Sequence, residues 1–228
     1  MKKILIILIA ILSFNSYAQS KTELLKHFEA YYQQMKNQGD MQGIINAMTH
    51  LDVLEPTQAR KDTLAYVYLS EGRNLEALNT IGIESNATDS DINVEVKAIA
   101  LKALNQPDRS LVHYNELFKR QPNAYLAYEI AELNIQLSDL AGAKTSVEYG
   151  LANVTTDMKR TFYETQQPYQ TSLKAALLYL KALVHFNENK ETNKESALVI
   201  LSHALVEDPN FNMARVTKEA LLAIKKTE

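Results

Sequence analysis

The sequence has no cysteine and no tryptophan, and it has only 6 glycines and 5 prolines in 228 residues. Without cysteine the protein can form no disulfide bond, and no histidine has a cysteine partner for a zinc site. Because alanine, leucine, lysine and glutamate are abundant while glycine and proline are rare, the composition favours an all-helical protein.

Positive charge is also scarce. The chain has 24 lysine and arginine residues against 27 aspartate and glutamate residues. Without Lys2 and Lys3 near the N-terminus, 22 basic residues stand against 27 acidic ones. Binding to nucleic acid requires a basic stripe, and binding to a membrane surface is favoured by a polybasic segment. We therefore expect no nucleic-acid partner and no electrostatic attachment to a membrane.

The first 18 residues have the pattern of a signal peptide. Two lysines precede an apolar run from residue 4 to residue 14, and Ser16 and Ala18 are the small residues that a signal peptidase reads. A spanning helix needs about 20 apolar residues, so this run is too short for a retained anchor. We expect cleavage between Ala18 and Gln19, which leaves a periplasmic or secreted protein with no stable membrane anchor.

The stretch from residue 64 to residue 78, LAYVYLSEGRNLEAL, has the pattern of two short helices folded back on each other. Leu64 and Tyr68 lie one helical turn apart on an apolar stripe. We expect the first helix to end at Gly72, because glycine enters the left-handed conformation without a Cβ clash. Ala77 is small enough for two antiparallel helices to approach to about 8–10 Å.

The same pattern recurs with a period of 33 residues. The position of close helix approach is occupied in turn by Ile44, Ala77, Ser110 and Ala143, and large apolar residues follow one turn later at Met48, Ile81, Tyr114 and Val147. This repeat resembles the tetratricopeptide repeat (TPR), a helix–turn–helix unit that buries its apolar face by stacking on its neighbours. The resemblance covers four units, about residues 21–153, and we expect a fifth unit around Ala197.

The resemblance implies an all-α fold, a right-handed superhelix (α-solenoid) of TPR-like helix–turn–helix repeats with a C-terminal capping helix. We expect four repeats in residues 19–153, a connector in 154–170, and a fifth helical pair with the capping helix in 171–228. The apolar face of the capping helix should cover the end of the stack through Met213, Val216, Ala220, Leu221 and Ile224.

The connector breaks the 33-residue period. We interpret it as a simple insertion that proteases should cut first, at Lys159 and Arg160. A functional role stays open, because the aromatic residues Phe162, Tyr163 and Tyr169 in a polar loop need something to pack on.

Motifs for catalysis or metal binding are missing from the sequence. The five histidines form no H-E-x-x-H pattern, and there is no G-x-S-x-G elbow or phosphate-binding glycine loop. Residues 89–95 resemble a calcium loop, but Val94 stands where the loop needs glycine. Capping of the following helix explains Ser90 and Asp91 better. We predict no catalytic residue, no cofactor and no metal, and thus a protein that is not an enzyme.

The TPR resemblance implies a concave groove, lined by the first helix of each repeat, that holds a partner protein or peptide. By helix phase we expect the uncovered, partner-binding residues of this groove to be Tyr66, Leu69, Glu95, Ile99, Lys102, Tyr125, Tyr128, Glu132 and Ile135. The best-known peptide-binding TPR proteins clamp a C-terminal carboxylate with lysine and asparagine, and the residues here do not reproduce that cluster.

The predicted function is that of an exported protein–protein interaction module, or adaptor, of the cell envelope. The alternative is a module that binds a small ligand such as a cell-wall glycan or peptide. The identity of the partner and the oligomeric state stay open at this point.

Overall fold

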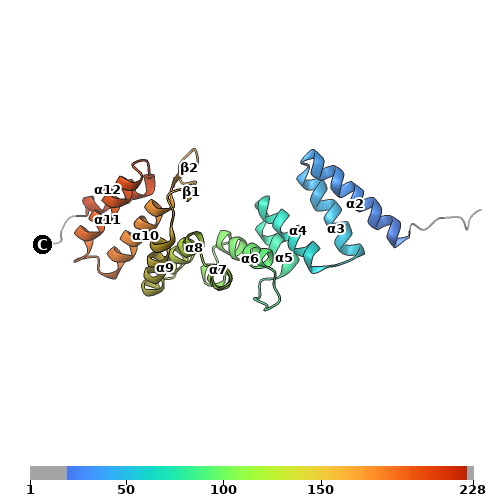
Figure 1. Cartoon of the computed structure of the whole chain (residues 1–228), viewed down its shortest axis with the longest axis horizontal. Helices are drawn as coiled ribbons and strands as arrows, with labels where there is room; N and C mark the ends of the chain where they lie inside the picture. Colours follow the sequence, from blue (N-terminus) through green and yellow to red (C-terminus); the bar gives the residue numbers. More distant parts are fainter. Residues whose placement is uncertain (1–19, 225–228) are drawn as a thin grey trace, which may run out of the picture. The chain divides into compact units, whose positions relative to one another are not determined.

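The computed structural model describes residues 20–224, and these residues form helices and one small β-hairpin (Figure 1). The chain divides into two compact units, residues 1–81 (unit 1) and residues 82–228 (unit 2), at a position that the repeat pattern did not mark. Unit 1 contains α2 (Lys21–Gln38), α3 (Met41–Leu54), α4 (Gln58–Ser70) and α5 (Asn74–Ile81). Unit 2 contains α6 (Asp91–Ala103), α7 (Pro107–Arg120), α8 (Ala124–Gln136), α9 (Leu140–Asn153), β1 (Lys159–Phe162), β2 (Tyr169–Ser172), α10 (Leu173–Glu188), α11 (Lys194–Glu207) and α12 (Asn212–Ala223).

Local sequence signals set the helix boundaries in unit 1. Ser20 and Glu23 form a capping box at the start of α2, each side chain accepting a backbone N–H from the other residue. Gly39 and Gly72 both adopt the left-handed conformation, with φ of 70°. Gly39 ends α2, and Gly72 lies in the turn after α4. The turn predicted at Gly72 is therefore confirmed.

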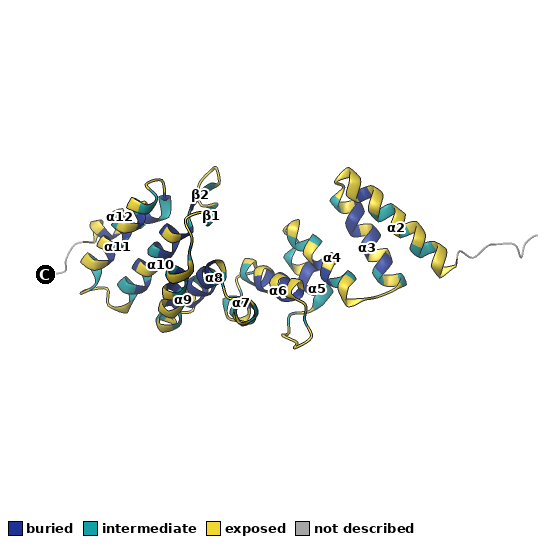
Figure 2. Cartoon of the chain, viewed as in Figure 1, coloured by how far each residue is buried: buried dark blue, intermediate teal, exposed yellow. Residues whose placement is uncertain are grey.

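The 33-residue register is confirmed by burial. Ile44, Ala77, Ser110 and Ala143, which stand 33 residues apart, are all buried, as is Ala197 in the expected fifth pair. The two helices of each pair pack on each other, and buried residues run along their ribbons (Figure 2). Ser110 is the polar member of the series, and its hydroxyl donates a 2.8 Å hydrogen bond to the Ala98 carbonyl of α6. This bond offsets the cost of burying a hydroxyl where the other repeats have an apolar side chain.

Replacing Ala143 with leucine is expected to lower the free energy of unfolding by roughly 1–3 kcal/mol, because the close α8–α9 contact has no room for the larger side chain. Ala77→Leu should have the same effect in unit 1. Chemical denaturation of each variant measures the change. Replacement of the exposed Ala152 by leucine is the control and should leave the midpoint close to that of the parent. Unchanged midpoints for both buried positions would contradict the register.

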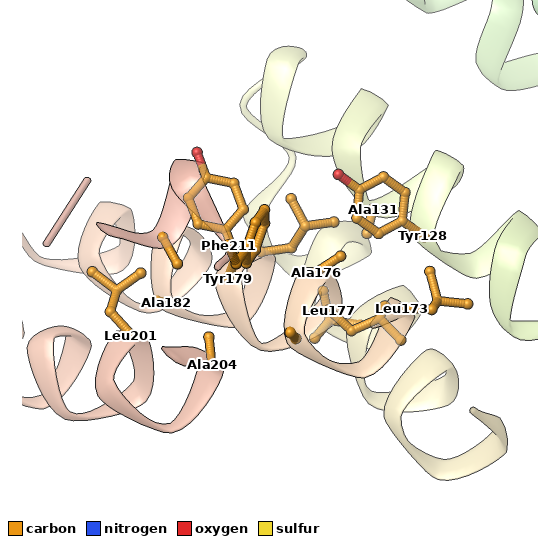
Figure 3. Close-up of a cluster of buried hydrophobic side chains, with 14 of the residues drawn as sticks. Tyr128, Ala131, Leu173, Ala176, Leu177, Tyr179, Ala182, Leu201, Ala204 and Phe211 are labelled. Carbon is orange, nitrogen blue, oxygen red and sulfur yellow. The ribbon is translucent and has the colours of Figure 1, made fainter. Parts of the chain in front are cut away.

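The largest core lies in unit 2, where α8 and α9 pack with α10, α11 and α12 (Figure 3). Leu173, Leu177 and Leu201 are fully buried there, and Phe211 lies at the turn before α12. Gly150 lets α9 approach α10 closely, since a Cβ at this position would stand 2.6 Å from Leu177 Cδ2.

The connector contains a β-hairpin instead of an open loop. β1 pairs antiparallel with β2, with Lys159 opposite Ser172 and Phe162 opposite Tyr169. The Phe162 ring stacks on Tyr169 at 5.8 Å and lies 5.1 Å from the ring of Phe211. Two of the three aromatic residues thus have packing partners, and the third, Tyr163, is 75% exposed.

The hairpin is also joined to α11 by hydrogen bonds. Asp208, at the end of α11, accepts a hydrogen bond of 2.5 Å from the Thr171 hydroxyl and one of 3.1 Å from the Ser172 N–H. This packing removes the physical reason for expecting the first proteolytic cut at Lys159 and Arg160.

The predicted buried face of the C-terminal helix is partly wrong. Leu221 is buried and Met213 packs on the core, but Val216, Ala220 and Ile224 are exposed. The residue that α12 buries in their place is Ala214, three residues after the buried Phe211 ring. Phe211 fixes the start of the helix against the core, so the inward face follows positions 214 and 221.

Candidate partner-binding cleft in unit 2

A cleft of about 400 Å³ lies between α6, α7 and α8. The residues that line it are Asp91, Glu95, Ile99, Tyr114, Leu117, Arg120, Gln121, Asn123, Tyr125, Leu126 and Glu129. All of them belong to unit 2, and three of them, Glu95, Ile99 and Tyr125, are predicted groove residues.

The wall formed by α6 follows from the phase of that helix. Ser90 caps the helix by accepting the Asn93 N–H at 3.1 Å. Asp91, Glu95 and Ile99 then follow at intervals of four residues, which places them on one face. Glu95 is exposed and Ile99 is 37% exposed, so a carboxylate and an apolar side chain stand one helical turn apart on this wall.

The other lining residues come from α7, from the start of α8 and from the turn between them. Asn123 caps α8 by accepting the Leu126 N–H at 3.0 Å. Tyr125, in the first turn, is 42% exposed and lines the cleft. On α7 Tyr114 is buried, and Leu117 packs beside it in the same apolar cluster. Burial raises the pKa of the Tyr114 phenol, so this side chain stays neutral.

At one end of the cleft, ion pairs hold Arg120. Its guanidinium donates to the Asp91 carboxylate at 2.8 Å, to the Glu116 carboxylate at 2.9 Å and to the Asp89 carbonyl at 2.9 Å. The hydrogen bonds to Asp91 and Glu116 raise the pKa of Arg120. Arg120 is therefore a fixed structural cation, already committed to two carboxylates.

At the other end, Glu129 lies in an ionic network that includes the hairpin. Lys102 of α6 donates to the carboxylates of both Glu129 and Glu132. Arg160 of β1 donates to Glu129, and its guanidinium lies 4.1 Å from the centre of the Tyr128 ring. The Tyr128 hydroxyl donates to Glu132 at 3.2 Å. The network thus joins α6, α8 and the hairpin.

The surroundings in this network shift the pKa values of Glu129 and Tyr128 in opposite directions. Burial by itself would raise the pKa of Glu129, but Lys102 and Arg160 outweigh that effect and lower it. Burial and the nearby Glu132 carboxylate raise the pKa of Tyr128. At neutral pH Glu129 is therefore ionised and Tyr128 is neutral, which suits the phenol as a hydrogen-bond donor.

The structure separates the predicted groove residues into several environments. Three of them, Glu95, Ile99 and Tyr125, line the cleft. Lys102 and Glu132 lie in the ionic network. Ile135 is partly buried against the core. Tyr66 and Leu69 belong to unit 1 and are not among the residues that line this cleft.

The prediction that Tyr128 lies uncovered in the groove is wrong. Tyr128 is 1% exposed, because it packs into the core of unit 2 (Figure 3). The Arg160 guanidinium also lies over its ring. Helix phase placed Tyr128 toward the groove, but it could not reveal that the hairpin covers this part of α8.

Several cleft and network residues were missed by the sequence pattern. Arg160 lies in the connector, where nothing in the sequence identifies its partner 31 residues earlier. Glu129 could have been found, since it stands one turn after Tyr125 on the same face of α8. Arg120 could not have been found from the sequence, because its role depends on contacts with α6 and with the loop that precedes α6.

Unit 1 has a wider cleft of about 690 Å³ between α2, α3 and α4. The apolar side chains at its base, Met48 and Leu51, are buried members of the core. Arg60, on its rim, is bonded to the Glu55 carboxylate at 2.8 Å. Tyr32 and Ala59 also line this cleft, but none of the predicted groove residues does.

Within residues 20–224, no group of three or more histidine, aspartate or glutamate side chains is placed to hold a metal ion. Among the described helices, none combines the length and apolar character needed to cross a membrane.

Comparisons with known proteins give a result for the fold. No protein-family model matches the sequence, and no curated protein matches it. YrrB, described as a TPR protein with an unusual peptide-binding site, is similar in structure, with a TM-score of 0.66, 13% identity, and coverage of 89% of this chain and 99% of that one. The structural likeness to YrrB supports the fold, and at this identity it does not carry over the binding site.

Two other TPR proteins of known structure also match. One, from Parabacteroides merdae, has a TM-score of 0.47 and 16% identity, covering 93% of this chain and 75% of its own. A thermophilic TPR protein of Thermus thermophilus has a TM-score of 0.48 and 15% identity, covering 90% of this chain and 100% of its own. Taken with the 33-residue register and the paired helices, the match to YrrB shows a TPR-like, all-α helical repeat fold.

Proposed function

We propose that this protein is a non-catalytic interaction module that holds a segment of a partner protein in the cleft between α6, α7 and α8. The observation that supports this most is the pair Ile99 and Tyr125, two partly exposed apolar side chains that line one cleft from rigid helices. Large aromatic side chains with a polar tip are enriched at protein interfaces. A fold-level analogy adds support, since TPR folds generally serve as scaffolds without catalytic activity.

Truncation of the two apolar side chains should weaken binding without unfolding the protein. Ile99→Ala and Tyr125→Ala should each raise the dissociation constant about 30-fold, the effect of losing roughly 2 kcal/mol at a central contact. Because both side chains are partly exposed, each change should alter stability by only about 0.5 kcal/mol. The measurement is a pull-down from cell-envelope extract with identification by mass spectrometry, followed by titration calorimetry with the captured protein.

A matched control is Val206→Ala, an apolar truncation on α11 at a position that is more exposed than either cleft residue. It should bind like the parent. Tyr66→Ala tests whether the groove residues predicted in unit 1 contribute as well. If both cleft variants capture everything that the parent captures, the cleft is not the binding site.

A second candidate function is binding of a small ligand, since 400 Å³ is within the usual range for small-molecule sites. Calorimetry with purified cell-wall peptides and glycans distinguishes the two. Saturable binding that Tyr125→Ala abolishes, together with an empty pull-down, would favour the small ligand.

We further propose that the protein is exported to the cell envelope, which rests on the signal-peptide pattern of residues 1–18, outside the described residues. Expression of the full sequence in a bacterial host with a cell envelope should give a mature protein that begins at Gln19. Intact mass and N-terminal sequencing measure this directly. Replacing Ala18 with arginine should block cleavage, because the peptidase reads a small residue there. A mature protein that retains residues 1–18 would exclude export by cleavage.

A further inference from the structure

Among residues 20–224, one charged group of the cleft has no ion-pair or side-chain hydrogen-bond partner. Asp91 is paired with Arg120, and Glu129 is paired with Lys102 and Arg160. Glu95, exposed on α6 between these two sites, makes no ion pair and no side-chain hydrogen bond in the described part of the chain. Its carboxylate faces the cleft with its charge unneutralised.

The surroundings of Glu95 do not offset that charge. The cleft and the ion pairs that touch it hold five carboxylates, Asp91, Glu95, Glu116, Glu129 and Glu132, against three cations, Lys102, Arg120 and Arg160. Each of these three cations already contacts two carboxylates. The cleft therefore has excess negative charge, and a partner with a carboxylate at this position would be repelled.

The spacing of the open groups limits the shape of the partner. Glu95 and Ile99 lie four residues apart on a helix, which puts their Cβ atoms about 5–6 Å from each other. In an extended peptide, side chains two residues apart point the same way and are separated by about 6.6 Å. An extended segment can thus place one side chain at Glu95 and the side chain two residues further along at Ile99, in the cleft that Tyr125 also lines.

We propose that the cleft recognises an extended protein segment in which a lysine or arginine stands two residues from a large apolar residue. The basic side chain pairs with Glu95, and the apolar side chain packs between Ile99 and Tyr125. This inference rests on the proposed function and adds to it the chemistry of the partner. The negative charge of this cleft is opposite to the positive charge expected of a clamp for a C-terminal carboxylate.

The test is a selection from a displayed library of random ten-residue peptides on the immobilised full-length protein. Sequences enriched over bare beads should contain lysine or arginine two positions from leucine, isoleucine, phenylalanine, tyrosine or methionine. For a selected peptide, Glu95→Gln should raise the dissociation constant about two- to fivefold, the range for an exposed ion pair. Glu95→Lys should raise it about tenfold or more, since it replaces attraction by repulsion.

A matched control for the charge reversal is Glu191→Lys, an exposed glutamate in the turn between α10 and α11, outside the cleft. It should leave the affinity unchanged. A new selection on Glu95→Lys should lose the basic residue and enrich aspartate or glutamate in its place. Raising the salt concentration should weaken binding to the parent more than binding to Glu95→Gln.

The outcomes separate this inference from the proposed function. If the selected peptides lose affinity for Ile99→Ala and Tyr125→Ala but show no basic preference, the cleft binds protein segments and the charge inference is wrong. The charge inference is also wrong if Glu95→Lys binds the selected peptides with the same affinity as the parent. If no peptide is enriched, or if none of the cleft variants changes the dissociation constant of the selected peptides, both the proposed function and this inference fail.

Discussion

Replacing Lys97 with methionine is expected to destabilise unit 2 by roughly 3–5 kcal/mol, the usual cost of breaking a buried ion pair. The Lys97 side chain, on α6, is fully buried, and its ammonium donates to the Glu84 carbonyl and to the Asp89 carboxylate, both at 2.7 Å. Methionine fills similar volume but leaves Asp89, whose side chain is only 10% exposed, without its cation. Guanidinium denaturation monitored by circular dichroism gives the change.

The control for this prediction is Lys144→Met. Lys144 also pairs with a carboxylate, that of Glu188 at 3.2 Å, but its side chain is 56% exposed. Because exposed pairs contribute at most about 1 kcal/mol, this variant should unfold close to the parent. Equal, small effects of the two replacements would show that the Lys97 pair does not stabilise the loop before α6.

The same pair should make stability depend on pH. Burial alone would raise the pKa of Asp89, but hydrogen bonds from Lys97 and the Asn86 N–H outweigh it and lower the pKa below its ordinary value of 3.8. A depressed folded-state pKa contributes stability that is present above the unfolded-state value. That stability should be lost as the pH falls below about 4, and Lys97→Met should show a smaller loss.

The second large effect is expected from Arg160→Ala, which should cost about 2–4 kcal/mol. This expected loss is smaller than that for a fully buried ion pair, because the Arg160 side chain is 23% exposed. The change removes a cation from the partly buried Glu129 carboxylate and uncovers the Tyr128 ring. It also removes the contact that fixes β1 to α8. Thermal and denaturant unfolding should both record the loss.

Lys159→Ala is the matched control, since Lys159 is the preceding residue of the same strand and is exposed. It should change the stability by about 0.5 kcal/mol or less. Limited proteolysis gives an independent measurement. The hairpin of the parent should resist trypsin, whereas in Arg160→Ala cleavage at Lys159 should come first. Cleavage of the parent and of Arg160→Ala at the same rate would contradict a fixing role for Arg160.

The parts of the fold that follow from short-range sequence signals were predictable. Gly72 ends its helix for a conformational reason, and Ala77 and Ala143 repeat because every helix pair needs a close approach at the same position. Glu95, Ile99 and Tyr125 follow from helix phase in the same way. These features depend on residues no more than a few turns apart.

The features that the sequence did not predict correctly depend on long-range contacts. The hairpin has two strands of four residues each, and no alternating apolar pattern marks them. Arg160 meets Glu129 across 31 residues of sequence, so the burial of Tyr128 could not be read from α8 alone. The phase of α12 likewise depends on Phe211, whose partners Phe162 and Tyr179 lie on the hairpin and on α10.

The hairpin also changes how unit 2 should come apart. In a simple stack each repeat contacts only its neighbours, so unfolding can begin at an end and spread one repeat at a time. Here one short insertion contacts α8 through Arg160, α11 through Thr171 and the turn before α12 through Phe162. Fraying of the last two helices must therefore break contacts with the hairpin, which is itself bound to α8. Hydrogen exchange should accordingly report one opening free energy for α8 through α12, where a chain of independent repeats would give a gradient.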